Sequence, residues 1–500
     1  MEHFLATPAP THFVVATSLF ALYIALKTVY RLFFSPLAGF PGPRLAASTK
    51  LFEAYHMIIK DDWLETLERL HRQHGPVVRI GPAELHFNDH DFCVTHHAQR
   101  NLSKCTNYYG LLSTLLGGIS SPHGHSDRKA IIQPLFSGKT LADFSKTTMD
   151  RHIESLHDRL MTNPTNAPVN GTHHLWAYTN DIVVSYLVDK DMGYLWEKDL
   201  TKVHDSLRAF SSIEFATVLR AMPPIKKMFD VFPSLRRISP LNWLDELVFS
   251  HLQDIVDDDL ENRHGKDHGS VLARLWREIG DNRIVGQEAA QAMFIGNESL
   301  LSNLTCLLHY MIFNPECVAQ LRAELDTLDV GTYGHRVWRD PKVLQLPYLD
   351  AICRESTRLS SPSWHRQPRM CAEPVEYRGT VIPANVSMSF TLRLLERDPK
   401  MYPEPESFIP ERWLGQDPEA QKNRTRSVTF GTGSRTCLGQ IIARHVLRKT
   451  LAALVYNFDI SLWDEEKDVA EGFRYLNTYP RKGAEGFLNL RLTPRFKGDM

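Results

Sequence analysis

The feature that most constrains the architecture of this 500-residue chain is an apolar run close to its N-terminus. From Phe13 to Phe34 the 22 residues are apolar, apart from small hydroxyl residues and the cations Lys27 and Arg31 near the end of the run. About 20 such residues are enough for a helix to cross a bilayer, and both cations can extend their charged ends to the interface. The run therefore predicts a single membrane-spanning helix.

The residues around the run indicate an anchor that is retained. A cleaved signal peptide carries its positive charges before the apolar segment and small residues after it. Here Met1, Glu2 and His3 precede the run, whereas Arg44 and Lys50 follow it. Because positive charges stay on the cytosolic side of a span, the bulk of the chain is expected in the cytosol. A buried helix of the globular body is the alternative interpretation.

A proline-rich segment, Ser35 to Pro43, separates the predicted anchor from the rest. Proline fixes φ and lacks an N–H donor, so neither a helix nor a central strand can continue through it. No repeat, Ser/Gly linker or low-complexity tract follows, which favours one continuous domain. We therefore divide the chain into an anchor (1–34), a hinge (35–50) and a single body (51–500).

Most of the body has apolar residues at three- and four-residue spacing, which is typical of helices. The helical segments are Trp63–His74, Leu141–Met161, Ile284–Phe313, Pro315–Leu328, Tyr348–Leu359 and Leu438–Tyr456. Shorter runs with β-strand character are Val77–Ile80, Glu84–Phe87, Val375–Ile382, Val386–Phe390 and Leu488–Leu492. The pattern predicts a mainly α fold with small β-sheets.

Net charge and cysteine usage exclude several classes of protein. Lys plus Arg number 57 against 58 for Asp plus Glu, a net charge of -1, so no global field attracts nucleic acid or an acidic partner. The seven cysteines include no CxxC pair and no Cys/His cluster with zinc spacing, and their number is odd. This usage fits a reducing compartment and leaves one cysteine for a special role.

Cys437 is the candidate, in the segment Phe430-Gly-Thr-Gly-Ser-Arg-Thr-Cys-Leu-Gly439. Gly431 and Gly433 allow the backbone to approach a flat ligand, while Arg435 and the start of the following helix favour the thiolate over the thiol. An iron-bound sulfur suits such a site. Taken alone, these residues fit a Gly-rich turn with an inert buried cysteine equally well.

The segment resembles the haem-binding signature of the cytochrome P-450 family. The fixed positions of that signature correspond to Phe430, Gly433, Arg435, Cys437 and Gly439. Three further stretches stand in the family's order and spacing: Gly296-Asn-Glu-Ser299, Glu355-Ser-Thr-Arg358 and Pro410-Glu-Arg-Trp413. The resemblance implies a cytochrome P-450 fold behind the N-terminal transmembrane helix. It also implies haem b as cofactor, with Cys437 as the axial thiolate ligand and the other signature residues around the haem.

The resemblance gives three charged residues a structural role. Glu355 and Arg358 are three residues apart and share a helix face, and in the family such a pair is joined by the arginine that corresponds to Arg412. An isolated pair would be interpreted as a solvated surface bridge. In the family the three residues form a buried network behind the haem.

The segment Phe294–Leu300 resembles the acid-alcohol site of the family's distal helix. The resemblance implies that Glu298 and Ser299 are catalytic and relay protons to dioxygen. Ser299 stands where threonine is usual and lacks the methyl group that fixes the rotamer. Ile295 stands where a small residue is usual and would narrow the space above the iron. The polar face of an ordinary helix is the alternative interpretation.

The two propionates of haem need cations and hydrogen-bond donors. The family pattern points to His125, Arg128 and Lys129 in an early helix, and to Arg369 and Arg435 later in the chain. Many relatives have Trp at the position of His125 and Arg at the position of Lys129. Lysine cannot bond bidentately, a loss that Arg128 could compensate. The alternative for this charge cluster is a solvated helix end.

The source of electrons is expected to be a separate protein. No GxGxxG opens a helix after a strand, so no flavin or nicotinamide fingerprint is visible. The resemblance therefore implies an NADPH-dependent reductase in the same membrane, which we expect to dock on Arg444, Arg448 and Lys449. With a thiolate ligand that favours O–O cleavage, the implied reaction inserts one oxygen atom from O2 into the substrate.

The substrate is expected to be a hydrophobic small molecule. The family pattern places residues 108–121, Ile295, 362–365 and 475–479 over the haem, and these segments are largely apolar and aromatic. Residues 222–233 are amphipathic and fit either an entry route that dips into the bilayer or a buried segment of the core.

The resemblance covers nearly the whole chain and is greatest to filamentous-fungal members of the trichodiene-oxygenase-like and pisatin-demethylase-like groups. It rests on the opening through Pro43 and on residues 74–80, 410–413 and 492–495. Those groups act mostly in secondary metabolism, which favours a terpenoid substrate, with polyketides or alkaloids as alternatives. The chain is then expected to be a single-pass protein of the endoplasmic reticulum membrane. The rival functions are a non-redox haem-thiolate isomerase, whose members usually lack the acid-alcohol pair, and a silent haem-binding scaffold.

Overall fold

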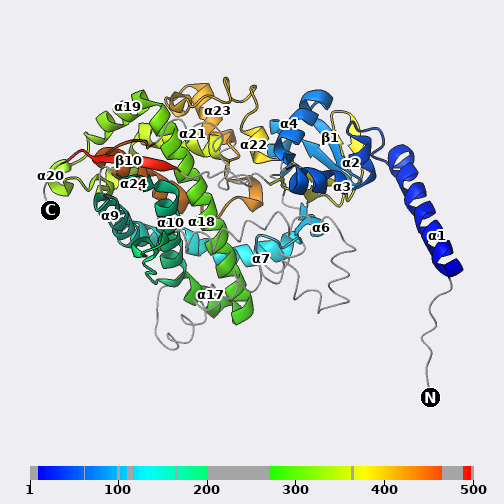
Figure 1. Ribbon diagram of the computed structural model, residues 1–500, viewed down its shortest axis with the longest axis horizontal. Coiled ribbons are helices and arrows are strands. Elements are labelled where there is room, and N and C mark those ends of the chain that lie inside the picture. The colour runs from blue at the N-terminus through cyan, green and yellow to red at the C-terminus, as the bar shows by residue number, and fades with distance from the viewer. Residues whose placement is uncertain are drawn as a thin grey trace, which may run out of the picture.

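Helices dominate the part of the chain that the structure describes, and small sheets lie among them (Figure 1). The computed structural model describes residues 10–60, 62–97, 99, 102–109, 116–163, 167–200, 270–361, 365–463 and 488–496. The mainly α fold with small β-sheets predicted from the sequence is therefore confirmed.

Each helix predicted from periodicity is present. The helices are α4 (Trp63–His74), α8 (Gly138–Lys146), α9 (Thr148–Met161), α18 (Asn282–Phe313), α19 (Pro315–Leu325), α21 (Pro347–Ser360) and α24 (Gln440–Asn457). The single helix predicted over Leu141–Met161 is divided in two at Thr147. The Thr147 hydroxyl and N–H both bond to the carbonyl of Asp143, at 2.7 and 3.1 Å, and such local bonds interrupt a helix.

The largest sheet has five strands in the order β1-β2-β8-β5-β3. These strands are β1 (Val77–Gly81), β2 (Glu84–Phe87), β8 (Ser387–Ser389), β5 (Arg369–Met370) and β3 (Ser103–Lys104). The antiparallel pairing of β3 with β5 sets Lys104 opposite Arg369. Two cations distant in sequence are thus brought to one place by strand register.

Two smaller sheets complete the β-structure. One contains β4 (Val169–Asn170), β10 (Asn489–Pro494) and β9 (Phe458–Leu462), and the other is the hairpin β6 (Val375–Tyr377) and β7 (Thr380–Ile382). The strand predicted over Val375–Ile382 is therefore two strands. It turns at Arg378 and Gly379, whose φ values of 50° and 77° are typical of a two-residue hairpin turn.

The helix α10 (Gly171–Val188) was not predicted from the sequence. All of its residues are buried, and a helix that is enclosed on every side has no amphipathic pattern to detect. It packs against α9 and α18 (Figure 1). Sequence periodicity consequently missed one of the helices that support the middle of α18.

The predicted anchor is a helix that projects from one end of the molecule (Figure 1). It comprises α1 (Pro10–Val29) and the π-helical turn η1 (Tyr30–Phe34). Among the described residues, Val14–Phe34 is the one helical stretch long and apolar enough to cross a membrane, and it is not buried. A buried helix of the body, the alternative interpretation, is thereby excluded, and membrane anchoring is supported.

The connection between anchor and body is held by Arg79 of β1. Its side chain donates to the carbonyls of Arg31 and Pro82 at 2.9 and 2.8 Å, and its N–H donates to the carbonyl of Pro41 at 2.7 Å. A Cβ added at Gly42 would lie 2.4 Å from the Arg79 carbonyl oxygen. The hinge is therefore packed closely on the body.

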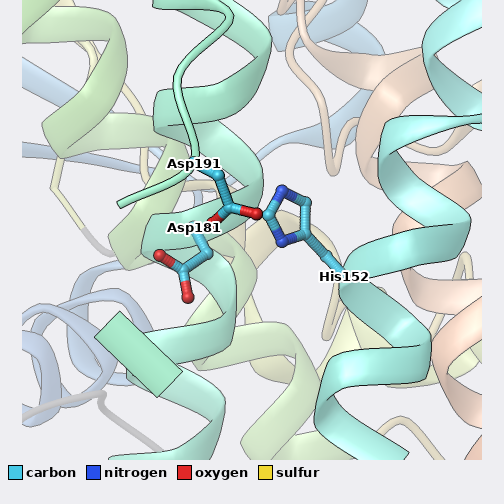
Figure 2. Close-up of side chains that lie close together, drawn as sticks. All are labelled: His152, Asp181 and Asp191. Atoms are coloured by element: carbon cyan, nitrogen blue, oxygen red, sulfur yellow. The ribbon is translucent and has the colours of Figure 1, made fainter. Parts of the chain in front are cut away.

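Figure 2 shows a group of polar side chains between α9 and α10, formed by His152, Asp181 and Asp191. Their potential ligand atoms lie within 4.8 Å of one another, but all three side chains are already engaged in bonds, Asp191 with the N–H of Gly193 at 3.1 Å. Asp181 accepts N–H bonds from residues 194 and 195, both at 3.0 Å, and His152 Nε2 bonds to Ser185 Oγ at 2.8 Å. We therefore assign this group to the packing of α9 and α10 and not to a metal.

Candidate active site

Cys437 lies in a loop whose shape depends on glycine. The loop leads from the short 3-10 helix η11 (Gly433–Arg435) to the start of α24, and the Cys437 N–H donates to the carbonyl of Phe430 at 2.9 Å. Gly431 and Gly433 have φ values of 75° and 65°, a conformation that side chains disfavour. Both glycines are therefore required by the path of the backbone around the sulfur.

Cys437 differs from the other six cysteines because its side chain is exposed, whereas all of theirs are buried. A Cβ built on Gly439 would lie 3.9 Å from the sulfur, so glycine keeps this side of the Cys437 sulfur uncovered. Burial of the surrounding loop raises the pKa of the Cys437 thiol, and a hydrogen bond with the Gly439 backbone lowers it.

The expectation that Arg435 favours the thiolate stays a prediction. In the structure the Arg435 guanidinium donates to the carbonyls of Ile119 and Ser120, at 2.9 and 3.5 Å.

Five basic residues, Arg435 among them, form a cluster. It comprises Lys104, His125, Lys129, Arg369 and Arg435. Burial and repulsion between these cations lower the pKa of His125 to about 3 and that of Arg435 to about 10. The pKa of Lys104 and that of Lys129 are lowered for the same reasons. Within the described ranges none of the five pairs with a carboxylate. We call these residues the cation cluster.

The cation cluster fits the two carboxylates of haem. Its lysines bond to neutral oxygens: Lys104 donates to the carbonyl of Gly117, and Lys129 donates to the carbonyl of Ser434 at 2.7 Å. Buried charges are normally paired, and a bound dianion would supply what the protein does not. The chain therefore has residues that would hold haem propionates, next to the loop that offers a sulfur ligand to iron.

The structure adds one residue to this group and places another one apart from it. Lys104 belongs to the cation cluster although no motif marks it; only its register opposite Arg369 reveals it. Arg128 instead lies 3.3 Å from Glu288 of α18, whose carboxylate also accepts the N–H of Leu116 at 2.9 Å. The structure thus brings His125, Lys129, Arg369 and Arg435 together and places Arg128 elsewhere.

Glu355, Arg358 and Arg412 form one buried network, as expected from the sequence. Arg358 makes two bonds of 2.8 Å to the carboxylate, and Arg412 from the 3-10 helix η10 (Pro410–Trp413) makes one of 3.0 Å. The indole N–H of Trp413 and the N–H of Ile409 also donate to Glu355, at 2.8 and 3.1 Å. A single carboxylate therefore joins α21 to the segment that precedes the cysteine loop.

The proposed acid-alcohol turn lies in the middle of α18, which packs against α24. Glu298 and Ser299 are half-buried, and Ile295 is 50% exposed. Gly296 lies against Val183 of α10: a Cβ added to Gly296 would be 3.4 Å from a Val183 methyl. Glycine therefore lets α10 support this turn closely, while Ile295, Glu298 and Ser299 remain accessible.

Part of the expected substrate pocket lies outside the described residues. This applies to 110–115, 362–364, 475–479 and the amphipathic stretch 222–233. Of the remainder, Tyr108 is buried, and the guanidinium of Arg366 lies 4.7 Å from the centre of its ring.

The predicted reductase-docking residues are not free surface cations. Lys449 is 3% exposed and donates to Asp150 at 2.7 Å, so its assignment to a docking surface is wrong. Arg448 is bonded to Asp350, and Arg444 lies over the ring of Phe430 at 5.4 Å. Arg444 and Arg448 are half-buried, so a docking role for these two arginines stays a prediction.

Comparisons with known proteins agree with this geometry. A family model described as Cytochrome P450 matches residues 119–477. The chain is 29% identical to the cytochrome P450 monooxygenase sdnE of Sordaria araneosa, over 94% of this chain and 96% of the relative. It is 27% identical to the cytochrome P450 monooxygenase pbrB of Penicillium brasilianum, over 89% and 90% of the two chains. It is 25% identical to the cytochrome P450 monooxygenase vrcB of Aspergillus aculeatus, over 93% and 97%.

Replacing Glu355 with alanine should abolish haem incorporation. The substitution leaves Arg358 and Arg412 as buried cations without their carboxylate, at a cost of about 3–5 kcal/mol. Haem content and the reduced CO-bound spectrum of the purified variant measure the effect, and normal values for both would refute the structural role.

Glu154 offers a matched control for this substitution. It also bridges two arginines, Arg336 at 2.6 Å and Arg339, but at the surface. Because exposed ion pairs contribute about 0–1 kcal/mol, Glu154→Ala should keep its haem.

Replacing Lys104 with methionine should weaken haem retention about tenfold, since a charge-assisted hydrogen bond is worth about 1.5–3 kcal/mol. The rate of haem transfer to excess apomyoglobin measures the loss. Lys146→Met, which removes an exposed lysine, is the control, and equal transfer rates for the two variants would remove Lys104 from the cation cluster's role.

Proposed function

Because this chain belongs to the cytochrome P450 family of haem-thiolate monooxygenases, we propose that it inserts one oxygen atom from O2 into a hydrophobic metabolite as a tailoring step of fungal secondary metabolism. The observation that carries the proposal is the exposed Cys437 in its glycine loop, beside a cation cluster that has no acidic partner among the residues the structure describes. Family members bind haem through a cysteine thiolate and receive their electrons from a reductase.

Each group of residues has a separate task in this proposal. The bound haem supplies the oxygen chemistry, and a thiolate ligand favours O–O cleavage. Cys437 would hold the iron, and the cation cluster would hold the propionates. The Glu355 network fixes the backbone behind the cysteine loop. These residues provide position and charge, while the reactive chemistry belongs to the cofactor.

Proton delivery is assigned to the distal helix. The Glu298 carboxyl would take a proton from solvent, and the Ser299 hydroxyl would pass it on to bound dioxygen. Both side chains are half-buried on α18, which suits groups that connect solvent to an enclosed site. This pair also distinguishes the proposal from a non-redox isomerase, which has no need of external protons.

We propose a terpenoid as the substrate class, with a polyketide or an alkaloid as the alternative. Ile295, exposed on a mostly buried helix, would narrow the site and select for shape. An apolar substrate dissolves in lipid, and the exposed helix Val14–Phe34 would keep the body at a membrane surface. We place the protein in the endoplasmic reticulum membrane, with the anchor (1–34), hinge (35–50) and catalytic body (51–500) in this order.

The full-length holoenzyme, reconstituted in lipid vesicles with an NADPH-dependent reductase, tests the function. The expected results are the reduced CO-bound spectrum of a thiolate-ligated haem and NADPH consumption that rises with a substrate. An isomerase would convert a peroxide without NADPH, and a scaffold would do neither. Metabolites that accumulate when the gene is deleted would identify the substrate.

Replacing Ser299 with alanine should increase the peroxide released per NADPH oxidised, because the hydroxyl that completes proton transfer is lost. The rate of substrate oxidation should fall about 10²-fold, the lower range for a catalytic proton donor, while the peroxide ratio rises toward its limit of one per NADPH, and haem content should stay normal. Ser302→Ala removes a buried hydroxyl from the same helix and should leave the ratio unchanged. An unchanged ratio for Ser299→Ala would count against the relay.

A further inference from the structure

The side-chain amide of Asn303 connects the acid-alcohol turn of α18 to the end of α21. Its Nδ2 donates to the main-chain carbonyl of Ser299 at 2.8 Å, and its Oδ1 accepts a hydrogen bond from the Ser360 hydroxyl at 2.7 Å. Asn303 and Ser360 are 4% and 2% exposed. A continuous hydrogen-bonded chain thus runs from Ser299 to the helix that carries Glu355 and Arg358.

The Ser299 carbonyl decides which way the Asn303 amide faces. A carbonyl oxygen only accepts hydrogen bonds, so the N–H₂ group of the amide must be directed at Ser299. The Asn303 oxygen is thereby left facing Ser360, whose hydroxyl donates to it. The Ser360 hydroxyl has a second acceptor in the carbonyl of Thr357 at 3.2 Å, so it would not be left unsatisfied without Asn303.

The bond from Asn303 acts on the backbone of Ser299. A side-chain donor placed on the carbonyl four residues earlier competes with the helix's own N–H and tilts that peptide. The direction of the Ser299 Cα–Cβ bond depends on the orientation of the peptide. Serine lacks the methyl group that restricts the threonine rotamer. The position of the Ser299 hydroxyl is therefore restricted by fixing its backbone instead.

The opposite flank of the same turn is also held by a polar pair. The Thr179 hydroxyl of α10 donates to Asn297 Oδ1, and both side chains are buried. Gly296 packs on Val183 of the same helix. α10 and α21 therefore both hold the turn in place. These contacts restrict local rotation of α18 about its axis.

We propose that Asn303 is a positioning residue for Ser299 and that Ser360 acts through Asn303 by holding its amide at the oxygen. The proposal rests on the proton-relay role of Ser299 proposed above. Burying an amide costs more than burying an apolar side chain of similar volume, so the core would not need an asparagine here for stability. Its polarity is explained by its effect on the neighbouring turn.

Asn303→Leu tests the proposal because it keeps the volume and removes both hydrogen bonds. The full-length holoenzyme with NADPH-dependent reductase is assayed without added substrate, and the peroxide released is divided by the NADPH oxidised without release of peroxide. We expect this ratio to rise about fivefold, the change that corresponds to one lost hydrogen bond. Haem content and the reduced CO-bound spectrum should stay normal, and amide hydrogen exchange should increase over residues 299–303.

Asn314→Leu is the matched control. Asn314 follows the last residue of α18, and its Nδ2 donates to the carbonyl four residues earlier, Tyr310, at 2.7 Å. It makes the same type of bond but lies away from the acid-alcohol turn. The control should leave the peroxide ratio unchanged; an equal rise in both variants would show a general effect of helix stability and overturn the proposal.

Ser360→Ala removes the hydrogen bond to the Asn303 amide oxygen and leaves the Asn303 side chain itself in place. It should raise the peroxide ratio less than Asn303→Leu, and it should have no further effect in the Asn303→Leu background, since residues that act through one another are not additive. Additive effects would overturn the role of Ser360. If Ser299→Ala raises the ratio and Asn303→Leu does not, only the positioning role fails. If neither variant raises it, the proton relay itself fails.

Discussion

The carboxylate of Glu355 is the interaction on which the rest of the site depends. It accepts bonds from two arginines, an indole N–H and a backbone N–H, so its charge is fully compensated without water. These donors come from α21 and from the segment 409–413, and α21, Trp413 and the cysteine-loop residue Phe430 line one small cavity. Loss of this one charge would release several segments at once, because each is held by the same two oxygens.

The charges of the cation cluster are arranged in the opposite way. The cation cluster contains five basic side chains that repel one another, and their described partners are neutral groups. Such an arrangement is unfavourable until an anion arrives, whereas the Glu355 network is complete in itself. The contrast separates a part of the structure built for stability from a part built to bind a charged ligand.

The acid-alcohol turn of the distal helix α18 is held in place on one side and accessible on the other. Its buried side carries Gly296, Asn297 and Asn303, which contact α10 and α21, and its accessible side carries Ile295, Glu298 and Ser299. The departures from the usual family pattern, Ile295 and Ser299, both lie on the accessible side. The rigid supports on the buried side make the position of a less restricted serine hydroxyl depend on its backbone.

The sequence by itself determined the family, the anchor, most helices and strands, and the cysteine loop, because these are local patterns of periodicity, glycine and motif spacing. It could not reveal α10, which is buried on all sides and has no periodic signal. Only tertiary structure decided which cations meet: strand register brought Lys104 to Arg369, and Glu288 drew Arg128 away. It also showed that Lys449 is buried against Asp150 and that the Arg435 side chain bonds to the carbonyls of Ile119 and Ser120. Such pairings depend on distances between segments far apart in the chain, which the order of residues does not fix by itself.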